Sequence, residues 1–264
     1  MGKANQVNKE TVLVLRTCGA DMTSYGGFKW PTSGYAAAPD WNPEHICGNG
    51  LHGLLFGVGD GSLLDWSLDA KWLVCEVDPA TVVDLDGKVK FPRCNVLYSG
   101  SRPEATRIIS ERHPGKAVVG GTATAGYGGT ATAGYRGTAT AGYGGTATAG
   151  DEGTATAGAS GTATAGYRGT ATAGYGGTAT AGDEGTATAG YRGTATAGYG
   201  GTATAGDEGT ATAGYSGVVA IQYWNGERYK CKIALVKDEY EEGELEPNQP
   251  YRLNDKGQFE KVKN

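Results

Sequence analysis

The feature that most constrains this chain is a run of twelve consecutive octapeptides, which extends from Gly121 to Ser216 and occupies 96 of its 264 residues. Each octapeptide reads Gly-Thr-Ala-Thr-Ala-Gly followed by two variable residues. The alternation of threonine and alanine has the period of two that is typical of a β-strand, and β-branched threonine favours strands. The flanking glycines tolerate the backbone angles of tight turns. We therefore predict one short strand and one tight turn per octapeptide.

The residues that follow the last repeat indicate which side of each strand is buried. The segment Gly217 to Ile221 continues the register, and Val219 and Ile221 stand where the repeats have alanine. We therefore expect alanine to point inward and threonine outward. A core of alanine methyl groups requires two closely spaced sheets and adds little hydrophobic stabilisation per residue. The stability of the repeat is expected to come mainly from backbone ladders and from stacking between neighbouring coils.

The charged residues among the variable pairs favour a coil of sixteen residues, which is two octapeptides. With 24 residues per coil, Arg168 would stack on Arg192 and Glu184 on Glu208, and like charges about 4.8 Å apart repel. With sixteen residues per coil, charged neighbours are opposite in sign along both edges, which carry Arg136, Glu152, Arg168 and Glu184 on one side and Arg192 and Glu208 on the other. We predict a mainly β fold with a narrow, two-sided β-solenoid of about six coils, about 29 Å long at roughly 4.8 Å per rung.

This register predicts two flat outer faces with two threonines per coil on each. The candidate ligand-binding or ice-binding residues are those of one face: Thr122, Thr124, Thr138, Thr140, Thr154, Thr156, Thr170, Thr172, Thr186, Thr188, Thr202 and Thr204. The opposite face repeats the pattern from Thr130 to Thr212. Threonine has a restricted χ1, so each face is expected to be a rigid grid of methyl and hydroxyl groups that can order water. A plain solvated β face is the competing interpretation.

Tyrosines occupy the turns of most repeats, and sixteen-residue coils stack several of them on one another. Tyr127 is expected above Tyr143, Tyr175 above Tyr191, and Tyr199 above Tyr215, because stacked rings pack favourably. The candidate self-association residues are Tyr127, Tyr143, Tyr175, Tyr191, Tyr135, Tyr167, Tyr199 and Tyr215. The two interpretations left open are a contact surface for a second copy and a simple shield over the turn edge.

The repeat resembles those of two families. A Thr-x-Thr pattern on a flat solenoid face is the ice-binding feature of several insect and bacterial ice-binding proteins. The segment 141–149, Ala-Gly-Tyr-Gly-Gly-Thr-Ala-Thr-Ala, is similar to the A-G-Y-G-S-T-x-T-A octapeptide of bacterial ice nucleation proteins. This resemblance covers the repeat alone, and it implies a non-catalytic protein whose partner is ice or ordered water.

A second resemblance extends over nearly the whole chain. In a family of uncharacterised phage and prophage proteins, a domain with a G-x-H motif, here Gly50-Leu51-His52, precedes octapeptide repeats. A tail similar to segment 246–253 follows them. This resemblance implies a phage-associated structural or self-assembling protein, with the tyrosine edges as its contacts, and it is the alternative to ice binding.

The segments on either side of the repeat differ from it in composition. We predict three parts: an α+β capping domain over residues 1–119, the solenoid over 120–217 and a β cap over 218–264. The first part is expected to contain strands at Thr11–Arg16, Trp72–Val77 and Thr81–Leu85, a helix at Glu104–Glu111, and a core of Trp30, Trp41, Phe56 and Trp66. In the last part, Val218–Val236 continues as longer strands, Asn254–Gly257 is a hairpin turn, and Asp238–Glu246 is an acidic, solvated loop.

Candidate catalytic chemistry is sparse and lies in the first part. His52, together with Arg16 and Thr17 near a strand end, resembles the NAD pocket of ADP-ribosyltransferases, which implies an enzyme as a further alternative; a structural role for His52 is the competing interpretation. Cys47 and His52 match no common zinc spacing. We therefore expect no enzyme activity, no metal and no cofactor.

Composition excludes several classes of function. The net charge of −5 and the absence of a basic stripe disfavour nucleic-acid binding. No apolar run is long enough to span a membrane and no secretory signal precedes the first strand, so we expect a cytoplasmic or virion-associated protein. The five cysteines form no C-x-x-C pair and are expected to be buried free thiols of a reducing compartment.

Overall fold

The computed structural model describes residues 11–238 and 244–262. The chain divides into two compact units, Met1–Gly121 and Thr122–Asn264. The boundary coincides with the start of the first repeat strand. The further division that would separate a C-terminal cap from the solenoid stays a prediction.

A seven-stranded antiparallel sheet forms the first unit, in the order β2-β7-β4-β1-β3-β6-β5. Its two long central strands match the predicted ones, whereas the expected third strand is reduced to a 3-10 turn at Pro79–Thr81 and two strand residues. The strands are β1 (Val12–Cys18), β2 (Gly34–Ala37), β3 (Leu51–Leu55), β4 (Lys71–Val77), β5 (Val83–Asp84), β6 (Val89–Phe91) and β7 (Arg93–Gly100).

Aliphatic residues of the central strands, rather than the expected aromatic residues, dominate the core of this unit. Of the four predicted core aromatics only Trp30 is buried, while Phe56, Trp41 and Trp66 are half-buried. The indole N–H of Trp66 donates to the carbonyl of Gly61 at 2.9 Å, which satisfies the polar group of this half-buried ring. The buried core residues of the sheet include Leu13, Val14, Leu15, Leu73, Val74, Val77, Phe91 and Val96.

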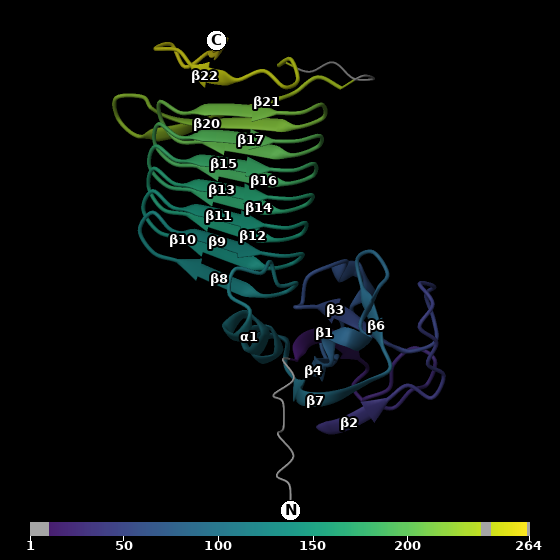
Figure 1. Ribbon diagram of the computed structural model, residues 1–264. Coiled ribbons are helices and arrows are strands. Elements are labelled where there is room, and N and C mark those ends of the chain that lie inside the picture. The colour runs from purple at the N-terminus through teal and green to yellow at the C-terminus, as the bar shows by residue number, and fades with distance from the viewer. Residues whose placement is uncertain (1–10, 239–243, 263–264) are drawn as a thin grey trace, which may run out of the picture. The chain divides into compact units, whose positions relative to one another are not determined.

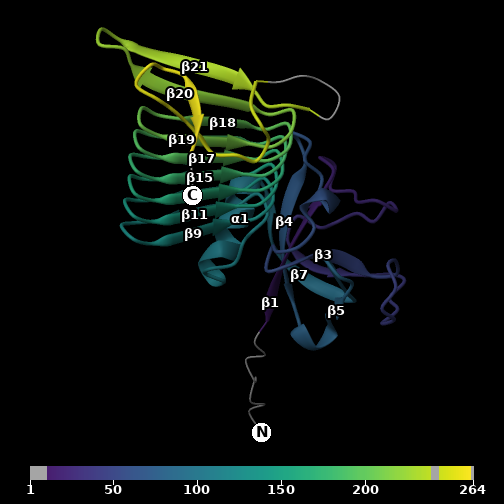
Figure 2. The same ribbon diagram turned by 90° about the horizontal axis from the view of Figure 1, so that it is seen from above.

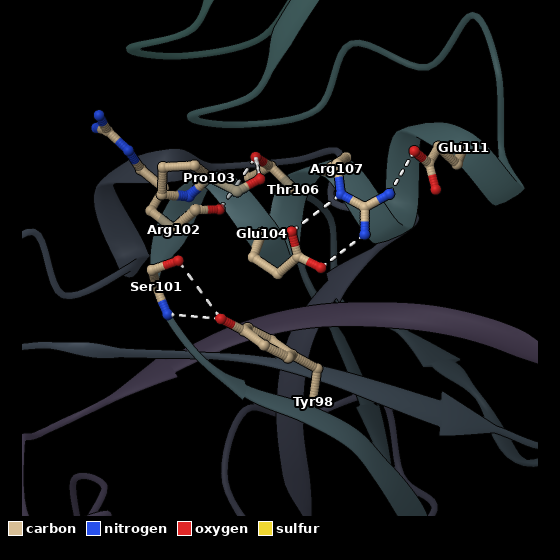
Figure 3. A network of polar contacts seen from close by, with 8 residues as sticks. All are labelled: Tyr98, Ser101, Arg102, Pro103, Glu104, Thr106, Arg107 and Glu111. Carbon is tan, nitrogen blue, oxygen red and sulfur yellow. Dashed lines mark hydrogen bonds and ion pairs between the residues drawn. The ribbon is translucent and has the colours of Figure 1, made fainter.

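The predicted helix is present as α1 (Arg102–Arg112), with Pro103 in its first turn. It packs on β4, β1 and β7 through buried residues that include Ala105 and Ile109. On its exposed side Arg107 lies between Glu104 and Glu111 and forms ion pairs with both (Figure 3). Pairs three and four residues apart stabilise an isolated helical turn.

The repeats form a solenoid of two parallel sheets, and its coil is sixteen residues long, as predicted. The strands of successive coils stack in two sheets (Figure 1). Each strand pairs in register with the strand sixteen residues away, so that Thr138 lies beside Thr122 and Thr154. We call the two sheets even and odd after their strand numbers. The even sheet contains β8 (Thr122–Ala125), β10 (Thr138–Ala141), β12 (Thr154–Ala157), β14 (Thr170–Ala173), β16 (Thr186–Ala189) and β18 (Thr202–Ala205). The odd sheet contains β9 (Thr130–Ala133), β11 (Thr146–Ala149), β13 (Thr162–Ala165), β15 (Thr178–Ala181), β17 (Thr194–Ala197) and β19 (Thr210–Ala213).

Alanine fills the interior of the solenoid and threonine faces outward, which confirms the predicted orientation. From Ala131 to Ala213 every alanine of the repeat strands is buried. Glycine is needed where coils touch: a Cβ at Gly166 would lie 2.8 Å from the backbone nitrogen of Asp151 in the preceding coil. The uniform octapeptide therefore reflects the narrow space between the sheets and between the coils.

Longer strands with bulkier side chains close the C-terminal end, as expected. β20 (Val218–Trp224) pairs with β18 and places Val219 and Ile221 beside Ala203 and Ala205. β21 (Tyr229–Leu235) continues the even sheet as its last strand (Figure 2).

The odd sheet ends differently, in the predicted hairpin of β22 (Tyr251–Leu253) and β23 (Phe259–Lys261). Buried Tyr251 stands beside Ala211 at the end of the alanine core. Most of the predicted acidic loop, residues 239–243, lies outside the described residues.

Candidate functional site

The threonines of each sheet form two straight rows on its outer face. We call these surfaces the even face and the odd face. Because every pairing is in register, each threonine stands directly beside its equivalents in the neighbouring coils. In each strand from β9 to β17 the first threonine is exposed and the second is half-buried. The two faces therefore present the same periodic arrangement of methyl and hydroxyl groups, which agrees with the expected geometry of the predicted ligand-binding residues.

The two faces differ in how they end. On the even face the rows of Thr202 and Thr204 continue into Val218 and Ala220 of β20. These pair with Leu235 and Ile233 of β21, which are 60% and 61% exposed. The even face is thus extended by an apolar strip made of Val218, Ala220, Ile233 and Leu235.

The threonine rows of the odd face end at charged side chains. After Tyr251, which pairs with the last odd strand, Arg252 forms an ion pair of 2.6 Å with Glu260 of β23. Charged groups hold their own hydration shells strongly, so this end interrupts the surface that the threonine rows define.

The turns along one side of the solenoid, which we call the Tyr135 edge, carry alternating charges. Arg136 pairs with Glu152 at 2.7 Å, and Arg168 pairs with Glu184 at 3.0 Å. The hydroxyl of Tyr135 donates to Glu152 at 2.7 Å. This hydrogen bond, with the bond from Arg136, lowers the pKa of Glu152, and the same carboxylate raises the pKa of the Tyr135 hydroxyl.

The opposite turns, which we call the Tyr127 edge, carry stacked tyrosines. Tyr127 and Tyr143 have ring centroids 5.4 Å apart and are nearly parallel, as predicted. Tyr175 and Tyr191 also stack at 5.4 Å. Tyr127, in the first coil of this edge, is 82% exposed.

The charged pair of the Tyr127 edge is Arg192 and Glu208, whose side chains lie 2.7 Å apart. Glu208 also accepts a hydrogen bond from the Tyr191 hydroxyl. This bond and the Arg192 contact lower the pKa of Glu208, while the pKa of Tyr191 is raised by the same bond. The predicted opposite-sign stacking is therefore present on both edges.

The eight tyrosines proposed for self-association are divided between the two edges. Tyr127, Tyr143, Tyr175 and Tyr191 belong to one edge, and Tyr135, Tyr167, Tyr199 and Tyr215 to the other. They do not form a single surface, because the two sheets separate the edges.

Arg16 and His52, the candidates for a catalytic role, lie in the first unit and are in contact. Arg16 donates to the carbonyl of His52 at 3.2 Å and stacks over Trp30 at 3.9 Å. Burial lowers the pKa of Arg16 to about 10. Burial, followed by the charges of Lys88 and Arg16, lowers the pKa of His52. Two buried nitrogens, Arg16 Nε and His52 Nε2, have no hydrogen-bond partner within the described part of the chain.

The cysteines are only partly as expected. Cys18, Cys75 and Cys94 are buried free thiols, but Cys47 and Cys231 are exposed. The Nζ of Lys88 lies 3.0 Å from the Cys47 sulfur, and this hydrogen bond lowers the pKa of the thiol. Over residues 11–238 and 244–262, no three metal-binding side chains come together, and no helix has the length and apolar character needed to cross a membrane.

The fold and these faces define a repeat β-solenoid with threonine rows on both sides and paired charges at its turns. In sequence, the chain is similar to bacterial ice nucleation proteins. It is 42% identical over 108 residues to one from Pseudomonas syringae pv. syringae, 40% over 107 residues to one from Xanthomonas campestris pv. translucens, and 39% over 105 residues to the protein InaU of Pantoea ananas. The resemblance stated from the repeat is thereby confirmed.

The matches cover limited parts of both chains. They include 39–40% of this chain but span only 7–10% of the length of those three relatives. Residues 12–108 match a family described as a domain of unknown function, DUF7666. No solved structure matches the chain.

Sequence reasoning missed the difference between the two faces. The apolar strip depends on β21, whose alternating side chains Ile233 and Leu235 face outward beside β20. The segment Tyr229–Leu235 carries the signal, since its isoleucine and leucine alternate with other residues as in a strand. Its pairing partner, however, was not evident from the pattern.

Proposed function

We propose that this protein binds ice or ordered water through the even face, in the manner that the similarity to ice nucleation proteins suggests. The observation that carries the proposal is the in-register array of threonines on a solenoid whose backbone ladders hold it rigid. Regularly spaced methyl groups restrict the water beside them, while hydroxyl groups anchor it by hydrogen bonds. A flat solid surface is the partner that such a repeating arrangement fits.

We favour the even face over the odd face because of the residues that follow the last threonines of its rows. The strip of Val218, Ala220, Ile233 and Leu235 extends the even face with groups that do not bind water strongly. The odd face ends at the ion pair of Arg252 and Glu260. The residues proposed to contact ice are therefore the even-face threonines from Thr122 to Thr204.

A pair of matched double variants tests this assignment. Thr154→Lys with Thr170→Lys places two charges in the middle of the even face, and Thr146→Lys with Thr162→Lys does the same on the odd face. All four threonines are exposed, so the fold is expected to survive. We expect the even-face variant to need a concentration about tenfold higher for the same inhibition of ice recrystallisation, and the odd-face variant to keep its activity, because charged groups hold their own water.

The measurement is made on folded proteins, as checked by circular dichroism, together with the freezing temperature of droplets. Equal losses from the two variants would remove the assignment to the even face. Wild-type protein without thermal hysteresis, recrystallisation inhibition or a shift in freezing temperature would remove the proposed function itself.

The alternatives stay predictions. Self-association through the tyrosine edges, with or without a phage partner, draws support from the exposed, stacked rings of Tyr127 and Tyr143. An NAD-binding pocket in the first unit draws support from the unpartnered nitrogens of Arg16 and His52.

A further inference from the structure

The hairpin formed by β20 and β21 lies beside a hollow at one corner of the solenoid. The last residue of β18, Ala205, pairs with Ile221, but β20 continues three residues further, to Trp224. The turn that joins β20 to β21 therefore projects beyond the stacked turns of the coils (Figure 1). Beside this overhang lies a cavity of about 310 Å³.

Three elements supply the polar and aromatic lining of this cavity. The even face, the Tyr127 edge and the hairpin each contribute two side chains, which are Thr188 and Thr204, Tyr191 and Asp207, and Gln222 and Tyr229. Within the described residues, no hydrogen bond engages the side chains of Thr188, Thr204 or Gln222. Their two hydroxyl groups and one amide can both donate and accept.

The two aromatic rings are held by their neighbours. Tyr191 stacks on Tyr175 at 5.4 Å, and its hydroxyl donates to Glu208. Tyr229 contacts Trp224 edge to face at 5.1 Å and remains 65% exposed. Both rings are thus positioned before any ligand arrives, which reduces the entropy lost on binding.

We propose that this cavity binds a neutral carbohydrate of the size of one or two sugar rings. Sugar hydroxyls donate and accept hydrogen bonds, as do the groups on Thr188, Thr204 and Gln222, and the Asp207 carboxylate adds a strong acceptor. Aromatic rings provide apolar surface for the C–H faces of a sugar. A volume of about 310 Å³ lies at the lower end of the range typical of small-molecule sites.

Charged ligands fit the same lining less well. Among the described residues, no lysine or arginine lines the cavity, so an anion would face Asp207 without a compensating charge in the lining. A cation would pair with Asp207, but it would use only the acceptor oxygens of the threonines and Gln222 and would leave their donors without a partner in the ligand.

The test is saturation-transfer NMR on the full chain with glucose, galactose, N-acetylglucosamine and trehalose as probes and choline as a cationic competitor. We expect transfer to at least one sugar. The variants Tyr229→Ala and Gln222→Ala should each weaken its binding about tenfold, or about 1.4 kcal/mol. The variant Tyr127→Ala removes an exposed ring at the far end of the same edge and should leave binding unchanged.

Several results would overturn the proposal: no transfer to any of the four sugars, transfer to choline alone, or an equal loss in the Tyr127→Ala variant. Circular dichroism of each variant separates lost binding from lost fold. None of the three substitutions touches an even-face threonine, so this result is independent of the ice assays.

Discussion

At the scale of single residues, the last position of every octapeptide adopts a left-handed backbone conformation. Four of these positions are glycine, whereas the others are arginine, glutamate or serine with φ between 52° and 57°. A side chain in this conformation costs about 1–2 kcal/mol, which glycine avoids. Arginine and glutamate offset the cost in part through ion pairs such as Arg136 with Glu152. Ser160, at φ 57°, makes no side-chain hydrogen bond within the described residues.

The variant Ser160→Gly is therefore expected to stabilise the solenoid by about 0.5–1 kcal/mol, because relief of the left-handed strain exceeds the added entropy of the unfolded chain. The midpoint of urea denaturation measures the gain. Arg168→Gly serves as the control, since there the same relief is opposed by loss of the pair with Glu184. A Ser160→Gly protein no more stable than wild type would contradict this account of the turn.

At the scale of elements, each turn edge is tied from coil to coil by tyrosine, arginine and glutamate side chains. Tyr135, Arg136 and Glu152 form one such group, and Tyr191, Arg192 and Glu208 form another. These groups are exposed, so each contributes little by itself and is screened by salt. Their effect is to hold adjacent turns in one register.

Stability is expected to depend on pH at both ends of the scale. The folded pKa of Glu152 and Glu208 is lowered, so their contribution is present above the unfolded value of about 4.3 and is lost as pH falls below it. The folded pKa of Tyr135 and Tyr191 is raised, so their contribution is present below about 10 and is lost as pH rises through the folded value.

Thermal melts across this pH range should show a fall in Tm on each side. A double variant with Glu152→Gln and Glu208→Gln should flatten the acid side relative to wild type. If the variant follows the wild-type curve below pH 5, other carboxylates govern acid unfolding.

Much of the solenoid could be predicted because its chemistry is local and periodic. The alternation of Thr and Ala gave the strands, and the signs of Arg192 and Glu208 distinguished sixteen residues per coil from 24. The sheet of the first unit was not predictable in this way, because β3 and β6 are short and pair across 36 or more residues. The hollow near Gln222 was not predicted either, because it depends on how far β20 extends beyond the end of its partner strand β18.

At the scale of the whole molecule, the number of coils sets the area of each threonine face without altering its structure. Each coil contacts only its neighbours, so stability and surface grow together as coils are added. A longer array presents more threonine methyl and hydroxyl groups in a single rigid lattice, which the proposed function requires.

Duplication of residues 121–216 should therefore give a twelve-coil solenoid that freezes droplets at a higher temperature than the six-coil protein at equal mass concentration. Far-ultraviolet circular dichroism should show a larger β signal per molecule, which confirms that the added coils fold. An unchanged freezing temperature for a folded twelve-coil protein would show that face area does not limit the activity.

The identity of the coils has a consequence for how the chain reaches its native state. A chain that pairs one coil out of step packs its remaining coils through identical alanine contacts, but it loses one rung and leaves sixteen residues, with their alanines, in an exposed loop. Loop closure adds only a slowly increasing penalty, so the free energy of such a slipped state exceeds that of the native state mainly by the contribution of one rung. The native number of coils is distinguished only at the C-terminal end of the solenoid, where the side chains differ from the repeat. There Val219, Ile221 and Tyr251 pair with the last alanines. Folding is therefore expected to include a slow, unimolecular phase in which the coils exchange between registers. The C-terminal residues stabilise the native register and so end this exchange.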